Sequence, residues 1–160
     1  EGDGWALRAI HTPGHAANHL VFALEGTDVL FSADHVMAWS TSIVAPPDGA
    51  MADYMASLDK MLEREDALYL PGHGGPVVQP AAFVRGLKAH RKMRERAIIE
   101  RLRAGDRTVR DMVAAIYRDV DPRLHGAAGL SVLAHLEDLV GRGIIAVEGE
   151  PSIDGVFIPV

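Results

Sequence analysis

Three residues that could bind a metal ion, His15, Asp34 and His73, each lie shortly after an apolar segment. Two imidazoles and one carboxylate form a ligand set that suits zinc. The chain has no cysteine, which excludes thiolate ligands and disulfides alike. The turns that carry these residues read HTPGH at 11–15, SADH at 32–35 and PGHGG at 71–75. One histidine in a turn is usually only solvated, but three such turns in one chain indicate a metal site.

Short strands must position the three residues. Strands are rigid and the turns that follow them are exposed, which is why α/β folds hold reactive groups at strand ends. We interpret three apolar runs as buried strands, at residues 5–10, 29–31 and 67–70. A further run at 19–24, followed by the turn EGTD at 25–28, predicts a hairpin. We therefore expect the side chains of the three residues to converge at one edge of the first domain.

Two helices are predicted after the hairpin. Asp48 is expected to begin the first helix, whose inward face carries Tyr54, Leu58, Met61 and Leu62 at helical spacing. Pro80 suits the first turn of a long second helix that ends at Gly105. One apolar face of that helix is expected to hold Phe83, Leu87, His90, Ala97, Ile98 and Leu102. We interpret His90 there as a packing residue rather than a ligand.

The last third of the chain predicts a small winged-helix unit. Thr108 followed by Asp111 resembles a capping box, and the helix it opens should bury Val109, Met112, Val113, Ile116 and Tyr117. A second helix is expected over 130–140, with Leu133, Leu136 and Val140 inward and its end at Gly141. Residues 144–147 and 156–160 then form a two-stranded ribbon around a turn at 148–152.

The three turns resemble the third, fourth and fifth metal-ligand motifs of the metallo-β-lactamase-fold hydrolases. By this resemblance His15 binds one zinc ion, Asp34 bridges two zinc ions, and His73 binds the second. The resemblance implies two zinc ions in each intact active site, with Asp34 as the catalytic residue that bridges them. It also implies hydrolysis of an ester, thioester or phosphodiester by metal-bound hydroxide. His11, His19 and His35 are candidates to orient the metal-bound imidazoles, or are ordinary turn histidines.

The tail is similar to that of the β-lactamase-like protein 2 group. The similarity lies in residues 90–91, 94–95, 115–117 and 133–136, and in the loop segments 36–42 and 46–49. It implies an α+β fold in which the C-terminal half of a metallo-β-lactamase αββα sandwich precedes a winged-helix-like module. The expected domains are residues 1–79 for the half-sandwich, 80–104 for the connecting helix and 105–160 for the winged unit. Animal members of this group act as endoribonucleases on single-stranded RNA, whereas for bacterial members the resemblance implies only a zinc hydrolase. The alternative function is therefore an endoribonuclease or an RNA-binding module that uses the basic helix at 85–110.

Three departures from the family pattern affect these expectations. Ala16 stands where the family usually has Thr, and Ala33 stands where Gly is usual. The H-x-H-x-D-H motif, which supplies four more ligands in the family, does not occur in the chain. We therefore expect a C-terminal fragment that binds zinc weakly and is inactive alone. The half-sheet should also expose apolar strand faces or an unpaired edge, which favours self-association.

Charge is distributed unevenly along the chain. The net charge is −6, yet residues 85–110 contain ten Lys or Arg against three acids, a local charge of +7. The long helix could therefore contact RNA through Arg85, Lys88, Arg91, Lys92, Arg94 and Arg96, or be a solvated helix only. For RNA binding we expect these residues to form one continuous exposed face. Residues 130–140 contain no Lys or Arg, which argues against sequence-specific reading of DNA.

The remaining composition narrows the cellular setting. Apolar residues make up 48% of the 160 positions, which suffices for one good-sized domain or two small ones. No apolar run approaches the length that spans a bilayer, and no signal-peptide pattern opens the sequence. The absence of cysteine mildly favours a reducing compartment. We therefore expect a cytoplasmic protein whose partners are small-molecule substrates or RNA.

Overall fold

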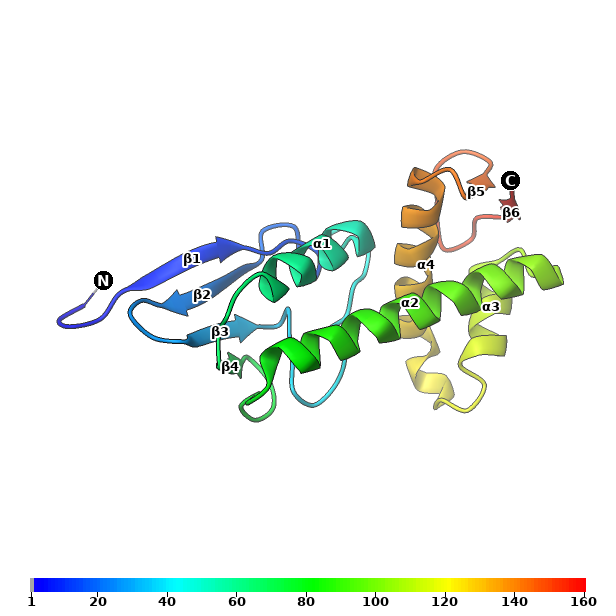
Figure 1. Ribbon diagram of the computed structural model, residues 1–160. Coiled ribbons are helices and arrows are strands. Elements are labelled where there is room, and N and C mark those ends of the chain that lie inside the picture. Colours follow the sequence, from blue (N-terminus) through cyan, green and yellow to red (C-terminus); the bar gives the residue numbers. More distant parts are fainter. Residues whose placement is uncertain (1) are drawn as a thin grey trace.

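A four-stranded sheet forms the first part of the computed structural model, which describes residues 2–160 (Figure 1). The strands lie in chain order: β1 Leu7–His11, β2 Leu20–Leu24, β3 Val29–Ala33 and β4 Leu68–Pro71. The pairs β1–β2 and β2–β3 are antiparallel, whereas β3 and β4 run parallel. A parallel pair needs a crossover, and α1 Met51–Leu62 provides it. The ends of β3 and β4 therefore lie at the same edge of the sheet.

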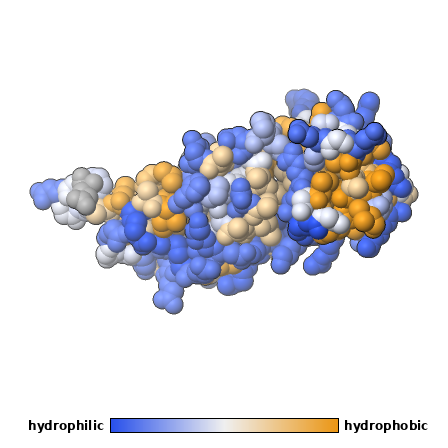
Figure 2. All heavy atoms as spheres, turned by 90° about the horizontal axis from the view of Figure 1, so that it is seen from above, coloured by the Kyte–Doolittle hydropathy of each residue, from blue (hydrophilic) through white to orange (hydrophobic). Residues whose placement is uncertain are grey.

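The two faces of the sheet have different surroundings. One face packs against α1 and the first half of α2, with Val21, Leu30, Tyr54 and Leu58 in a shared core. Residues directly opposite each other on paired strands point to the same face. The pairs Leu7↔Leu24 and Phe22↔Phe31 thus occupy the other face, where Leu7, Leu20 and Phe31 are 40%, 38% and 37% exposed. Apolar side chains are visible at the surface over these strands (Figure 2).

The prediction that residues 5–10 form a buried strand is wrong. All of β1 is exposed except Ile10, which is half-buried. The reason is position, because β1 is the edge strand of the sheet and only β2 pairs with it. Strand β3 also alternates between buried and more exposed positions instead of being buried throughout. The apolar pattern identified the strands correctly but did not show how many of their faces are covered.

Helix α1 begins later than predicted. Its N-cap is Ala50, which makes no side-chain cap, and Asp48 lies outside the helix. The Asp48 carboxylate accepts a hydrogen bond from the backbone N–H of Ala17 at 3.1 Å and so links the loop before α1 to the segment that follows the HTPGH turn. Tyr54, Leu58 and Met61 are buried as expected, and Leu62 is half-buried.

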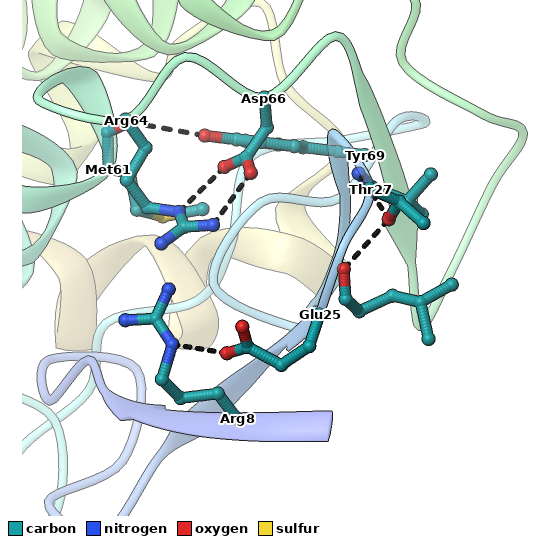
Figure 3. Close-up of polar contacts among 9 residues, drawn as sticks. Arg8, Glu25, Thr27, Met61, Arg64, Asp66 and Tyr69 are labelled. Atoms are coloured by element: carbon teal, nitrogen blue, oxygen red, sulfur yellow. Dashed lines mark hydrogen bonds and ion pairs between the residues drawn. The ribbon is translucent and has the colours of Figure 1, made fainter. Parts of the chain in front are cut away.

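Polar contacts fix the turns at the far end of the sheet (Figure 3). Arg64 donates two hydrogen bonds to Asp66, at 2.7 and 2.6 Å, in the turn between α1 and β4. The buried Tyr69 hydroxyl donates to the carbonyl oxygen of Met61 at 3.3 Å, and burial raises the pKa of Tyr69 to about 12. Arg8 pairs with Glu25 across β1 and β2 on the surface. The contacts of Asp66 and Tyr69 position β4, which leads to His73.

Helix α2 Pro80–Ala104 extends from the sheet into the second part of the molecule (Figure 1). Pro80 stands in the first turn, and Gly105 ends the helix with φ +109, as the sequence predicted. Val84 and Leu87 belong to the core of the sheet, whereas Ile98 and Leu102 belong to a second core. One helix therefore contributes to both hydrophobic cores. The domain limits at 79 and 104 stay a prediction.

The second part contains three helical segments and a ribbon. They are α3 Val109–Ile116, η1 Pro122–Leu124, α4 His125–Gly141, β5 Ile145–Val147 and β6 Phe157–Pro159. Thr108 caps α3 by accepting the N–H of Asp111 at 3.2 Å, as predicted, and β5 and β6 pair antiparallel. Helix α4 begins five residues earlier than the predicted 130. Ile116, Tyr117 and Val140 are half-buried rather than buried.

None of the helices in residues 2–160 combines the length and the apolar composition that crossing a membrane requires.

Candidate metal centre

Asp34 and His73 lie side by side where two parallel strands end. The distance from Asp34 Oδ1 to His73 Nε2 is 3.6 Å. Asp34 follows β3 and His73 follows β4, so the parallel pairing brings the two side chains to one edge. The backbone N–H of Gly72 donates to the carbonyl oxygen of Ala33 at 2.9 Å. A Cβ at Gly72 would lie 2.6 Å from Asp34 Oδ1, so this close approach needs glycine.

The imidazole of His15 is oriented by a backbone group. Its Nδ1 lies 2.6 Å from the carbonyl oxygen of Ile43. A carbonyl oxygen only accepts, so Nδ1 carries the proton and, in the neutral ring, Nε2 keeps its lone pair. Metal-bound histidines are usually held in this way, with one nitrogen donating to a carbonyl or carboxylate and the other on the metal. The hydrogen bond of His15 therefore suits a metal ligand.

The backbone on both sides of the centre is held in conformations that few residues adopt. Gly14 has φ +130, and a Cβ there would lie 2.3 Å from the backbone of Tyr54. The HTPGH turn therefore packs directly on α1. Ala33 has φ +46, which is the left-handed region that glycine favours. This conformation explains why a glycine is usual at that place in the family pattern.

Two hydroxyl groups hydrogen-bond to backbone carbonyl oxygens of Asp34 and His35. Ser42 Oγ lies 2.6 Å from the carbonyl oxygen of Asp34 and 2.9 Å from that of His35, and shares its one proton between them. The Tyr54 hydroxyl donates to the same His35 carbonyl at 3.0 Å. Ser42 and Tyr54 are both buried. Sequence reasoning missed these supports because only the fold brings residues 42 and 54 to this loop.

Two further histidines, His19 and His35, lie next to His15 and deeper in the fold. The ring centroids of His15 and His19 are 5.9 Å apart, and those of His19 and His35 are 5.5 Å apart. Burial, and then the nearby His15, lowers the pKa of His19, whose Nδ1 lies 3.0 Å from Thr12 Oγ1. His35 is fully buried against the Tyr54 ring, and burial followed by His19 lowers its pKa to about 3. His35 is therefore neutral at physiological pH.

The predicted orienting role of the other histidines is not seen as a hydrogen bond. Within residues 2–160, no hydrogen bond joins the ring of His11, His19 or His35 to His15, Asp34 or His73. His11 is exposed, and its Nε2 lies 2.9 Å from the carbonyl oxygen of Ala17. The carbonyl oxygen of Ile43, which no sequence motif marks, orients His15 instead.

The residues present fit a metal in donor type but not in number. Imidazole nitrogen and carboxylate oxygen are the donors that zinc takes in cysteine-free sites. In the chain from residue 2 onward, no three His, Asp or Glu side chains lie close enough to hold a metal ion together. The structure thus brings Asp34 and His73 together but does not place His15 in one three-residue group with them. A complete catalytic zinc site usually has three protein ligands.

The basic residues of α2 do not form the one continuous exposed face that the sequence predicted. Arg91 is only 4% exposed and donates to the carbonyl oxygen of Ser42. Arg94 lies over the Tyr117 ring at 4.3 Å, and Lys88 pairs with Asp59 on α1. Only three of the six candidate RNA contacts are exposed: Arg85, Lys92 and Arg96. The prediction failed because the sheet and the winged unit both pack on this helix.

Comparison with known families identifies both parts of the chain. Residues 1–73 match the metallo-beta-lactamase superfamily, and residues 108–154 match the beta-lactamase associated winged helix domain. The solved structure of a metallo-beta-lactamase family protein from Thermus thermophilus superposes with a TM-score of 0.85 at 27% identity. It covers 100% of this chain and 51% of the other. The two matches confirm the resemblance that the motifs predicted: a metallo-β-lactamase superfamily segment is followed by the winged helix domain associated with it.

Within this class the chain is similar to the β-lactamase-like protein 2 group. A beta-lactamase-like protein 2 homolog from Drosophila melanogaster is 32% identical over 154 residues, covering 91% of this chain and 49% of that protein. An atrochrysone carboxyl ACP thioesterase from Claviceps purpurea is 30% identical over 121 residues, covering 72% of this chain and 38% of that protein. The chain spans no more than about half the length of either relative.

Proposed function

We propose that the protein is a metal-dependent hydrolase in which His15, Asp34 and His73 are metal ligands. One observation carries this proposal: the 3.6 Å approach of Asp34 Oδ1 and His73 Nε2 at neighbouring strand ends. The hydrogen bond from His15 Nδ1 to the Ile43 carbonyl supports it, because it leaves Nε2 free to bind. Zinc suits this donor set better than calcium or magnesium, which prefer oxygen ligands.

When bound, zinc would supply a water molecule of lowered pKa and polarise the carbonyl or phosphoryl group under attack. The residues of this chain would hold the metal and keep their own geometry fixed. His15 is oriented by Ile43, and Asp34 is held by the contact of Ser42 with its carbonyl oxygen. The buried neutral His35 packs between His19 and Tyr54 and adds no charge beneath the site.

The substrate is proposed as an ester, thioester or phosphodiester. The name of the Claviceps relative, a thioesterase, favours an acyl substrate, though that name describes the relative only. Three ligands divided between two metals leave each metal short of protein donors. We therefore propose that the 160-residue chain alone binds zinc weakly and is inactive, and that further ligands come from the rest of a longer protein.

The test is a zinc titration with a competing chelator, on this chain and on the longer protein that contains it. His15→Ala, Asp34→Asn and His73→Ala should each weaken zinc binding by the longer protein by ~10-fold or more, the usual effect of losing a ligand or its partner. His11→Ala is the matched control, because His11 is exposed and its ring hydrogen-bonds to the Ala17 carbonyl rather than to a proposed ligand. Hydrolysis of thioester, ester, phosphodiester and single-stranded RNA substrates is measured in parallel. Unchanged zinc affinity in the three variants would exclude the proposed ligands.

A further inference from the structure

A cavity of about 310 Å³ lies behind the candidate metal centre, between the sheet unit and the winged unit. One wall is the loop at 41–43, a second is α2, and the third comes from the ends of α3 and α4. The polar groups in its lining are Thr41, Ser42, His90, Arg91, Arg94 and Ser131, with the ring of Tyr117 beside them. None of the three metal-ligand turns, at 11–15, 32–35 and 71–75, contributes to this lining.

The charge in this lining is entirely positive. Arg91 and Arg94 both face the cavity, and no Asp or Glu lines it. Among the ion pairs of residues 2–160, none includes either guanidinium group. A charge removed from water is costly unless an opposite charge or good hydrogen bonds replace the water. Two guanidinium groups at this cavity, one of them nearly fully buried, are therefore without a counter-ion.

Hydrogen bonding in the cavity is also incomplete. Arg91 donates to the Ser42 carbonyl, but its other contact, to Ser131 Oγ, is long at 3.4 Å. Arg94 Nε is buried without a partner, and so is His90 Nδ1. A buried donor that is left unsatisfied destabilises the fold, and a charged donor does so more strongly than a neutral one. A bound acceptor with several oxygen atoms would satisfy the Arg94 donor and would also accept from His90 Nδ1 in the tautomer that carries the proton there.

We propose that this cavity binds an oxyanion, and specifically a phosphate group. A guanidinium group presents a planar set of donors that matches phosphate oxygens in pairs. Thr41 and Ser131, which both carry hydroxyl groups, line two other walls, and further donors on several sides suit a tetrahedral anion with four oxygen atoms. The phosphate can come from the free ion or from a small phosphate ester, and the cavity is large enough for the attached group.

The cavity shares its wall with the candidate metal centre. The Ile43 carbonyl that accepts from His15 and the Ser42 hydroxyl that contacts the Asp34 carbonyl both belong to the loop at 41–43. A phosphate held there lies next to the backbone that positions two of the proposed ligands. The proposal goes beyond the proposed hydrolase function and does not rest on it, because phosphate binding is measured with metal removed.

The test is a calorimetric titration of the metal-free chain with inorganic phosphate at constant ionic strength. Wild type should show saturable binding, and Arg94→Gln should weaken it by ~10-fold or more, the effect of losing one charge-assisted hydrogen bond. Arg96→Gln is the matched control, since it removes the same charge from an exposed position on the same helix. The control should change the affinity by less than ~2-fold, because screened surface charge contributes little.

A second variant keeps the test decisive if Arg94→Gln disturbs the fold. Ala127 is exposed on α4 and lines the cavity, so Ala127→Glu brings a carboxylate to the two guanidinium groups. This variant should abolish phosphate binding and retain the circular dichroism spectrum of wild type. Phenyl phosphate binding more tightly than inorganic phosphate would identify an ester as the source, whereas equal affinity would identify the free ion. The absence of saturable binding, or equal weakening by Arg96→Gln, would overturn the proposal.

Discussion

The guanidinium group of Arg91 donates a hydrogen bond to the carbonyl oxygen of Ser42, although the two residues are 49 positions apart. The Ser42 hydroxyl in turn lies 2.6 Å from the carbonyl oxygen of Asp34. Arg91 also lies over the Tyr54 ring, at 5.1 Å from its centroid. A single side chain of α2 therefore links the loop of the candidate metal centre, helix α1 and, through Ser131, the winged unit.

Arg91→Ala should lower the free energy of unfolding by about 2–4 kcal/mol, because it leaves the buried Ser42 carbonyl unsatisfied and opens a cavity under Tyr54. Urea denaturation followed by circular dichroism measures the change. Arg85→Ala on the exposed side of α2 should stay within about 0.5 kcal/mol of wild type. Equal effects of the two substitutions would show that the Arg91 contacts contribute nothing specific.

Gly14→Ala should destabilise the protein strongly. The added Cβ would lie 2.3 Å from the Tyr54 backbone, and the residue would keep φ +130, so both a steric clash and backbone strain oppose it. We expect a loss of about 3 kcal/mol or more. Gly86→Ala is the control: Gly86 lies inside α2 with nothing within 4 Å of the added Cβ, so it should gain roughly 0.5–1 kcal/mol. Thermal denaturation of the two variants should move in opposite directions.

The uncovered sheet face should drive self-association of the 160-residue chain. Leu7, Leu20 and Phe31 lie exposed on this face, which no helix among the described residues covers. Apolar faces of this kind tend to bury themselves against another surface. Sedimentation velocity should show a concentration-dependent dimer that Leu20→Glu weakens.

A second group of apolar side chains is exposed near the β5–β6 ribbon (Figure 2): Ile144, Val156, Ile158 and Val160. Val156→Glu is therefore the control, and a dimer lost only with that variant would place the contact on the ribbon.

Local signals in the sequence predicted much of the fold. Pro80 and Gly105 set the limits of α2 and Thr108 marked the start of α3, because each acts on backbone within a few residues. The parallel neighbours β3 and β4 bring Asp34 and His73 together, which the strand-end argument expected. These features depend on turn chemistry and periodicity, both of which can be read from one sequence.

Contacts between distant segments could not be predicted. The burial of Arg91 depends on Ser42 and Ser131, which are 49 and 40 positions away, so a basic run seemed solvated when half of it was packed. The orienting group of His15 is a backbone carbonyl, and every residue has one. The exposure of β1 depends on what covers the sheet, which no pattern within the strand encodes. In each case the sequence identified the residue or strand but did not show which distant segment contacts it.

His135 should make stability depend on pH. It is buried in α4 with neither ring nitrogen hydrogen-bonded, and burial lowers its pKa to about 3. Arg91, Arg94 and His90 on α2 and Arg142 after α4 lower it further, because their charges oppose protonation. The unfolded chain binds a proton near pH 6.5, so the stabilising effect of the neutral ring is complete above that pH and is lost as pH falls toward 3.

His135→Leu removes this proton uptake while keeping an apolar side chain of similar size. Between pH 7 and pH 3 the wild type should lose roughly 3–5 kcal/mol more unfolding free energy than the variant. His35, whose pKa is also about 3, contributes equally to both proteins and cancels in the comparison. The measurement is urea denaturation at several pH values, with the difference between the two proteins plotted against pH. A difference that stays constant from pH 7 to pH 3 would show that His135 takes up its proton in the folded state as readily as in the unfolded chain.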